Sequence, residues 1–432
     1  MRCFRVFTFL ALLALVFPPA AFAFPPAAPS ADPAEAAVQA FLDALPESQR
    51  IAQIFLVNIE GNTSYAAVEH AAELCAGSGS AGDEPLVPGG CLLFSYNIAP
   101  DADGVMAFTE SIAAYCDAHH VLRPYIAVDQ EGGMVNRLRG LTSPLPSCRR
   151  VAEKLRPSEA GELYALQARQ LRALGVCMNI APVAEAALPQ NDAFLGSRSY
   201  GGIAATVAYS CAAVRAYQDC GVGTVLKHFP GNTNTDPHTG LPEIKLGVRE
   251  LLAQQLFPFA CILGAEPAAV LMSHARTEAC GGPAPACLSS FWIQTVLKDS
   301  LGCRALVLSD DIFMGALADN GFPPEAAAVQ AVQAGVDVIM LSEKKFAPVA
   351  RMLLERAASD ADFARRLAEA ERNVIRYKLA CGIFALRRQA DGSYVVEAQD
   401  TDVQFGSRAA RREAFSAAKA AGTAFVQQHF AE

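Results

Sequence analysis

Eight short apolar runs, separated by longer amphipathic stretches, constrain the fold of this chain more than any other feature of its sequence. The runs are rich in Val, Ile and Leu. Nearly all are continuously apolar, as expected of strands buried on both faces. They occupy Ile54–Val57, Cys91–Ser95, Tyr125–Val128, Cys177–Ile180, Thr224–Leu226, Ala269–Met272, Ala305–Leu308 and Val336–Leu341. Asn179 and Asp337 are the polar exceptions inside them. This alternation indicates parallel βα units.

The stretches between the runs carry apolar residues at helical spacing, three or four positions apart. Gly175 and Gly221 stand where two of these stretches would end. The expected helices are Pro157–Leu174, Ile203–Gln218, Arg249–Gly264, Ser290–Leu301 and one or two within Phe346–Ala380. Eight strands with intervening helices fit a closed (β/α)8 TIM barrel better than the alternative, an open doubly wound sheet.

Polar and ionisable residues cluster directly after the expected strands. The cluster consists of Asp129, Glu131, Lys227, His228, His274, Asp310 and Asp311. In a barrel this end carries the βα-loops, which hold the chemistry in nearly every enzyme of the fold. The clustering therefore predicts an enzyme.

Charge and motif content exclude several other classes. The net charge is −9, and there is no long Lys/Arg run to serve as the footprint of a nucleic-acid partner. The pair His119 and His120 and the single His274 lack the spaced partners that a zinc site needs. No Gly-rich loop followed by Lys-Ser/Thr is present to cradle phosphates. We therefore expect neither a metal nor another cofactor.

The N-terminus has the order of a secretory signal peptide. Arg2 and Arg5 precede an apolar run, Phe7–Phe17, and the small-x-small site Ala21–Ala23 follows. The run is too short to span a bilayer, so we expect no membrane span after cleavage. An exported protein, periplasmic or secreted, is predicted.

The remaining chain divides into three parts. Residues 24–36 are expected to be a linker, 37–383 the single catalytic barrel and 384–432 a short C-terminal extension. The extension ends in a helical pattern over Ser407–His429. Most cysteines lie in apolar or helical patterns that favour buried thiols. Cys280 and Cys287, which bracket a Gly/Pro-rich loop, are the one candidate disulfide.

Three segments in order are specific enough to indicate a family. They are DQEGG at Asp129–Gly133, KHFPG at Lys227–Gly231 running on to DPHTGLP at Asp236–Pro242, and SDDIFMG at Ser309–Gly315. Together they resemble glycoside hydrolase family 3, and within it the β-N-acetylglucosaminidase branch, over about residues 52–383. The resemblance implies a retaining β-N-acetylhexosaminidase.

The resemblance also implies catalytic roles. Asp310 would be the nucleophile. Its neighbour Asp311 would be structural, because consecutive residues leaving a strand point to opposite sides. Asp236 and His238 would form the acid/base dyad, with Asp236 fixing the imidazole tautomer. In an extended segment, residues two apart project to the same side, and Pro237 favours that geometry. The loop is two residues shorter than the usual family segment, which puts its mobility in question.

Sugar-binding positions follow from the same resemblance. Asp129 would hold two hydroxyls of the sugar in the −1 subsite, and Lys227 and His228 would grip it from the next wall. Arg137 and Arg198 match two further binding positions; the alternative for either Arg is a salt bridge that supports its loop. Met134 stands where relatives often carry Arg, so one basic contact is missing.

Several functions remain open on these residues. The expected substrate is a glycan or muropeptide that ends in N-acetylhexosamine. A phosphorolytic or transglycosylating enzyme is the alternative, because a neutral His repels phosphate less than a carboxylate does. A β-glucosidase fits the dyad less well. A catalytically dead sugar-binding protein would have no need of a nucleophile.

Overall fold

The protein is described by a computed structural model covering residues 33–74 and 84–431. The expected signal peptide and residues 24–32 of the expected linker lie outside the described residues. The helix α2 (Pro33–Asp43) begins inside that linker. It packs against α14 (Ala361–Ala380) and β14 (Tyr394–Ala398), and Glu35 pairs with Arg376. The last four linker residues are therefore helical because tertiary contacts hold them.

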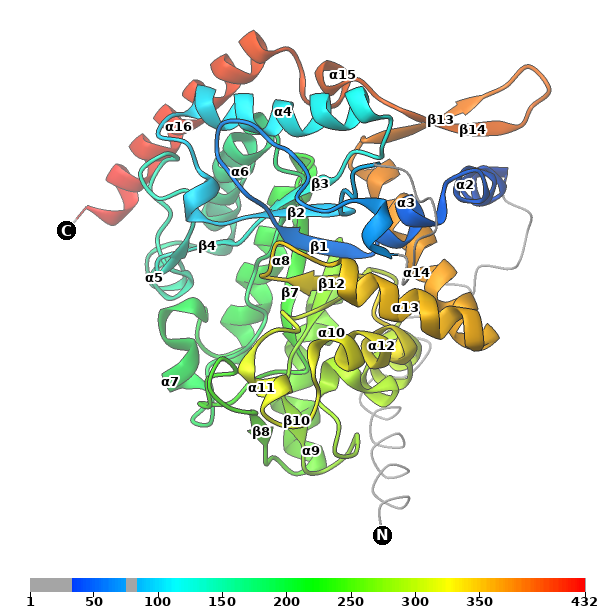
Figure 1. Ribbon diagram of the computed structural model, residues 1–432. Helices are drawn as coiled ribbons and strands as arrows, with labels where there is room; N and C mark the ends of the chain where they lie inside the picture. The colour runs from blue at the N-terminus through cyan, green and yellow to red at the C-terminus, as the bar shows by residue number, and fades with distance from the viewer. Residues whose placement is uncertain (1–32, 75–83, 432) are drawn as a thin grey trace.

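A parallel eight-stranded barrel forms the centre of the molecule (Figure 1). Each strand overlaps one of the eight runs read from the sequence. The strands are β1 (Phe55–Asn58), β2 (Gly90–Leu93), β3 (Tyr125–Val128), β6 (Met178–Asn179), β7 (Gly223–Phe229), β9 (Ala269–Met272), β11 (Leu306–Ser309) and β12 (Ile339–Leu341). The sheet order β11-β9-β7-β6-β3-β2-β1-β12 places β11 and β12 at its ends, and a parallel bridge between Leu308 and Val338 joins them. The predicted TIM barrel is confirmed.

Helices surround the strands, because each amphipathic stretch buries its apolar side against the sheet. The expected helices are all present, although two of them are partly or wholly π-helical. They are α6 (Pro157–Ala173), α8 (Ile203–Asp219), α9 (Val248–Glu250) continuing through η5 (Leu251–Leu256) into α10 (Phe257–Leu263), η7 (Phe291–Ser300), α13 (Ala347–Ser359) and α14. The outer ring also includes α4 (Ala102–His119) and α12 (Pro324–Ala334).

The two polar residues within the apolar runs tie neighbouring strands together. Asn179 accepts from the amide of Gln130 at 3.0 Å and donates to its carbonyl at 3.1 Å. Asp337, whose side chain is 1% exposed, accepts from the amide of Val307 at 3.0 Å and also binds Arg366 and Asn373. The Asp337 carboxylate thus links the two end strands at the point where the barrel closes.

One strand runs further than the sequence indicates. Lys227 and His228 were expected just past the end of a strand, and this is wrong, because β7 continues through Phe229. A shift in register between Leu226 and Phe229 lets the strand stay paired with β9. The two polar side chains therefore belong to the barrel wall.

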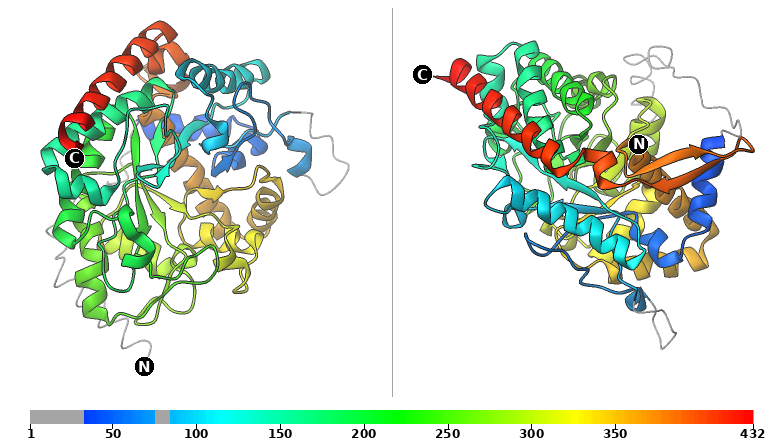
Figure 2. Two further views of the ribbon diagram at one scale, coloured as in Figure 1. Left: turned by 90° about the vertical axis from the view of Figure 1, so that its left-hand side faces the viewer. Right: turned by 90° about the horizontal axis from the view of Figure 1, so that it is seen from above.

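The C-terminal extension begins with a β-hairpin and ends in the helix that the pattern over Ser407–His429 predicts. A hairpin of β13 (Phe384–Arg388) and β14 leads into α15 (Thr401–Phe405) and α16 (Arg408–Phe430). Helix α16 lies along the outside of the barrel against α6 (Figure 2). Buried Arg411 anchors it by donating to the carbonyl of Ala173 at 2.8 Å and to Glu110 at 2.8 Å.

The candidate disulfide is wrong. Cys280 and Cys287 are buried free thiols. Cys287 contacts the imidazole of His274, with 3.2 Å between Sγ and Nδ1. The loop is closed instead by the hydroxyls of Thr277 and Ser289, which donate to the carbonyls of Cys280 and Gly281. Within residues 33–74 and 84–431, no helix is long and apolar enough to cross a membrane.

The buried Asp337 yields a stability prediction. Asp337→Ala leaves the Arg366 guanidinium and the Val307 amide without their carboxylate, and breaking a buried pair of this kind costs about 3–5 kcal/mol. We expect a loss of unfolding free energy of that size in urea denaturation followed by circular dichroism. Asp362→Ala is the control, since Asp362 and its partner Arg365 are both exposed and no measurable loss is expected. Equal stability of the two variants would contradict the role of Asp337 in barrel closure.

Candidate active site

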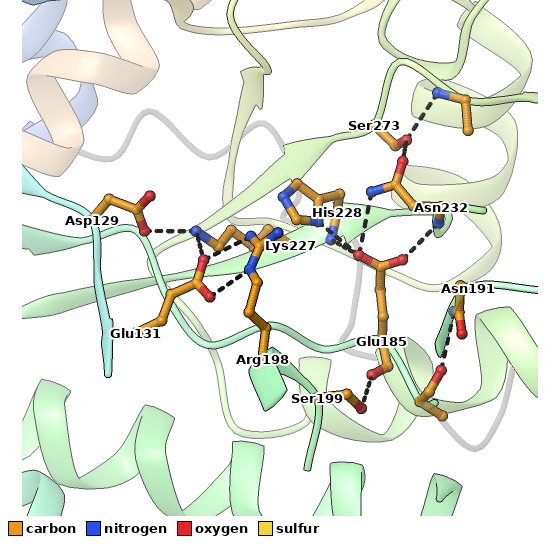
Figure 3. A network of polar contacts seen from close by, with 12 residues as sticks. Asp129, Glu131, Glu185, Asn191, Arg198, Ser199, Lys227, His228, Asn232 and Ser273 are labelled. Atoms are coloured by element: carbon orange, nitrogen blue, oxygen red, sulfur yellow. Dashed lines mark hydrogen bonds and ion pairs between the residues drawn. The ribbon is translucent and has the colours of Figure 1, made fainter. Parts of the chain in front are cut away.

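A cluster of buried opposite charges lies at the carboxyl end of the barrel, over β3 and β7 (Figure 3). The Nζ of Lys227 lies 2.7 Å from the carboxylate of Asp129 and 2.5 Å from that of Glu131. Asp129 directly follows β3, and Glu131 lies in the short strand β4 (Gln130–Gly132) of a hairpin with β5 (Val135–Asn136). The Lys227 and Glu131 side chains are 3% and 1% exposed, so their charges depend on each other.

The pKa values in this cluster follow from its pairing. Burial by itself raises the pKa of Glu131, but the charges of Lys227 and Arg198 outweigh burial and hold the pKa below its usual value. Burial likewise acts to lower the pKa of Lys227, and Asp129 and Glu131 reverse that effect and raise it. Both groups therefore stay charged at neutral pH. They form a fixed electrostatic wall beside Asp129, whose side chain is 24% exposed.

The two arginines expected at the site are placed differently. Arg137 lies 3.5 Å from Asp129, with its guanidinium over the ring of Phe94. Arg198 donates from Nε and Nη2 to the two oxygens of Glu131, at 2.8 Å each. Arg198 thus makes a two-point salt bridge with Glu131, which also pairs with Lys227. This is the kind of supporting salt bridge that was the alternative to sugar binding for either arginine.

Glu185 is a central residue of the site, although none of the three sequence motifs contains it. Its buried carboxylate lies 2.7 Å from Nδ1 of His228 and accepts from the backbone amides of His228 and Asn232 at 3.3 and 2.6 Å (Figure 3). Asn232 in turn accepts from the hydroxyl of Ser273 at 2.8 Å. Glu185 lies shortly after the fourth strand, at the end of the barrel where catalytic loops are expected. That position is the sequence signal that could have identified it.

The Glu185 carboxylate determines how His228 is presented. A carboxylate can only accept, so Nδ1 of His228 carries the proton toward Glu185. The other ring nitrogen, Nε2, is then turned away from Glu185. The His228 side chain is only 10% exposed, which leaves it a narrow contact with the open end of the barrel.

Asp310 and Asp311 follow β11 and have separate surroundings. The carboxylate of Asp311 accepts from the amides of Phe313 at 3.1 Å and Ser342 at 3.2 Å, so it joins the loops after β11 and β12. The carboxylate of Asp310 accepts from the amide of Asp311 at 2.9 Å. These contacts give Asp311 a structural function, while Asp310 is partly exposed to solvent.

The Asp236–His238 pair has the contact expected of a dyad. Nδ1 of His238 lies 2.7 Å from Oδ1 of Asp236, and the same oxygen accepts from the His238 amide at 2.9 Å. These hydrogen bonds, the backbone one foremost, lower the pKa of Asp236. The His238 side chain is 72% exposed, so Nε2 is accessible to a substrate arriving from solvent.

The dyad loop rests on the segment that follows Asp310. The amide of Ala316 donates to the carbonyl of Pro237 at 3.1 Å. A Cβ at Gly315 would lie 2.8 Å from the carbonyl oxygen of His238, so glycine is what lets the two loops meet. Asp310 and His238, far apart in sequence, are therefore carried on loops in direct contact.

The arrangement offers a half-buried carboxylate at Asp310, an exposed His–Asp pair and a wall of fixed charges. A nucleophile, a proton donor and acceptor, and hydrogen-bonding groups for hydroxyls are the parts that acetal cleavage requires. Across the described ranges 33–74 and 84–431, no group of three or more His, Cys, Asp or Glu side chains is placed to hold a metal ion.

Comparison with known proteins agrees with this geometry. The Glycosyl hydrolase family 3 N terminal domain matches residues 84–376. A β-hexosaminidase of Methylococcus capsulatus is 34% identical over 300 residues, which is 65% of this chain and 83% of that protein. The β-hexosaminidase LpqI of Mycobacterium tuberculosis is 31% identical over 263 residues, 58% of this chain and 66% of its own length.

Solved structures point the same way. A family 3 β-N-acetylglucosaminidase from a Paenibacillus species superposes with a TM-score of 0.68 at 25% identity, covering 87% of this chain and 69% of that one. The family match spans more than half of the chain, and the barrel agrees with it. The chain belongs to glycoside hydrolase family 3.

Proposed function

We propose that this protein is a retaining β-N-acetylhexosaminidase that removes terminal N-acetylglucosamine-type residues from glycans or peptidoglycan fragments. The observation that carries the proposal is the contact between Asp236 and Nδ1 of His238 on a loop that touches the segment following Asp310. The relatives named β-hexosaminidase support the sugar specificity. Export, expected from the N-terminal residues, is part of the proposal.

Asp310 is the nucleophile in this mechanism. Its carboxylate attacks the anomeric carbon and forms a covalent glycosyl-enzyme, which water then hydrolyses. Two inversions at one carbon return the β configuration. Asp311 is engaged by two backbone amides and holds the loop in place.

His238 transfers the protons. In the first step the imidazolium form of His238 gives its Nε2 proton to the leaving oxygen and becomes neutral. In the second step the neutral Nε2 takes a proton from water, which restores the imidazolium. Asp236 accepts from Nδ1, which fixes the tautomer and stabilises the imidazolium that forms when His238 acts as a base. The dyad is exposed to solvent, so a bound substrate would cover it and exclude water from it.

The charged wall binds the sugar. Asp129, held by Lys227 and Arg137, accepts hydrogen bonds from two hydroxyls. From the barrel wall, Lys227 contributes an N–H donor, and Nε2 of His228 accepts from a further hydroxyl because Nδ1 carries the ring's proton. Arg198 acts through Glu131 by keeping Lys227 in place. These groups are fixed before the sugar arrives, so little reorganisation is needed on binding.

The nucleophile assignment predicts a contrast between neighbours. Asp310→Ala should lose nearly all activity while remaining folded, because the attacking carboxylate is gone. Asp311→Ala should mainly lower stability, and Asp311→Asn should recover part of it because the amide oxygen still accepts from Phe313 or Ser342. The measurement is mass spectrometry of protein trapped with a slowly released fluorinated sugar, combined with thermal melting.

Two results would overturn the assignment. One is a label found on Asp311 or nowhere. The other is NMR detection of the α anomer as the first product released, since retention requires the β anomer first. Running the same assay with and without phosphate separates hydrolysis from phosphorolysis.

The dyad predicts a dependence on the leaving group. His238→Ala should slow cleavage of natural disaccharides by about 10²–10⁴-fold, because their alcohols leave poorly without a proton. Activated aryl glycosides should still form the glycosyl-enzyme, which then accumulates, and azide should release it. Asp236→Ala should show the same pattern more mildly. Steady-state rates on both substrate types measure the difference. Equal losses on both, without azide rescue, would reduce His238 to a structural loop residue.

A further inference from the structure

Two buried side chains lie behind the Asp310–Asp311 segment and take no direct part in the proposed reaction. His274 follows β9, and Cys287 lies in the one-turn helix η6 (Ala286–Leu288). Nε2 of His274 lies 2.9 Å from the carbonyl oxygen of Asp311, and Nδ1 lies 3.2 Å from Sγ of Cys287. The three groups form a chain from the thiol through the imidazole to the carbonyl of Asp311, the residue that follows Asp310.

The direction of this chain follows from donor and acceptor chemistry. A carbonyl oxygen only accepts, so Nε2 of His274 carries the hydrogen directed at Asp311. In a neutral imidazole the other nitrogen is then an acceptor, and the Cys287 S–H is its donor. Burial, and next the negative charge of Asp310, raise the pKa of the Cys287 thiol, which keeps this donor protonated.

The surrounding backbone leaves the chain little freedom. The Cys287 amide donates to the carbonyl of Ser273 at 3.1 Å, and the Ala286 amide donates to that of Ala275 at 2.9 Å. These two hydrogen bonds lie on either side of His274 in the chain, so they fix the segment that carries His274 to the segment that carries Cys287. His274 is 1% exposed and Cys287 is fully buried, so water does not compete for these hydrogen bonds.

We propose that Cys287 and His274 are positioning residues for the nucleophile: the thiol holds His274 as the neutral Nε2–H tautomer, and His274 fixes the peptide that aims Asp310 at the anomeric carbon. This inference rests on the proposed role of Asp310. Asp311 is then held twice, through its carbonyl by His274 and through its carboxylate by Phe313 and Ser342.

Neutrality of His274 also serves the reaction. An imidazolium beside the nucleophile would attract the Asp310 charge and oppose its transfer to the sugar in the attack step. A neutral imidazole fixes the backbone and adds no net charge. A cysteine suits the far end of the chain because it is a small buried donor that stays uncharged.

The proposal predicts a graded set of trapping rates. With the fluorinated sugar, His274→Leu should lower the limiting rate of Asp310 labelling by about 10²-fold, since small misplacements of a reacting group cost that much. His274→Gln retains an N–H that can reach the Asp311 carbonyl and should recover part of the rate. In each case the half-saturating sugar concentration should change little, because the binding wall is untouched.

Cys287 provides a matched series. Cys287→Ala should lower the labelling rate about fivefold, the equivalent of one hydrogen bond. Cys287→Ser should stay near the parent rate, because its hydroxyl also donates to Nδ1. Cys280→Ala is the control: Cys280 is a buried thiol of the same loop, but its side chain is outside the relay, and the rate should not change.

A spectroscopic readout tests the tautomer without any substrate. In ¹⁵N-histidine-labelled protein, the imidazole signals that disappear in His274→Gln should show a protonated Nε2 and a bare Nδ1, and Cys287→Ala should shift the Nδ1 signal. A protonated Nδ1, or equal effects of Cys287→Ala and Cys280→Ala, would overturn the relay. Labelling of Asp310 at the parent rate in His274→Leu would overturn it and leave the nucleophile intact. Absence of any label on Asp310 in the parent protein would instead remove the proposed function.

Discussion

Closure of the parallel sheet is the constraint on which the rest of this structure depends. Strands β11 and β12 meet through a single bridge between Leu308 and Val338, and the buried carboxylate of Asp337 completes the seam. Around this seam, the Ser309 amide donates to the carbonyl of Val338, and the Ser309 hydroxyl accepts from the amide of Met340 at 3.0 Å. The last strand residue before Asp310 is therefore held by the strand that closes the barrel.

The site is built by dividing its charges between buried pairs and exposed groups. The carboxylates of Glu131 and Asp129 balance the positive charges of Lys227 and Arg198, which makes the burial of these charges tolerable and their positions fixed. The buried carboxylate of Glu185 fixes His228 by accepting hydrogen bonds from its imidazole and from two backbone amides. The groups assigned to bond making and proton transfer, by contrast, lie on loops and meet solvent.

Contacts between loops connect the separate parts of the proposed mechanism. The dyad loop contacts Gly315 and Ala316, a few residues beyond Asp310, and His274 reaches the same segment from the neighbouring strand. The segment that follows the nucleophile is thus in contact with both the dyad loop and His274. These contacts explain how the two exposed side chains of the dyad are carried on a loop that touches the segment after Asp310.

The eight apolar runs were enough to predict the barrel, because a parallel strand buried on both faces leaves a local signature that needs no partner to be read. The three motifs likewise placed Asp129, Lys227, Asp236, His238 and Asp310 at one end of it. What the sequence did not reveal depends on contacts between distant segments. The extension of β7 through His228 comes from pairing with β9, and the helix at Pro33 is held by α14 and β14. Glu185 bonds residues more than forty positions away, and the thiol of Cys287 faces an imidazole instead of Cys280. Local pattern determines which segments become strands, but only the closed barrel decides which side chains share a buried, low-dielectric space, where each polar group must find its partner.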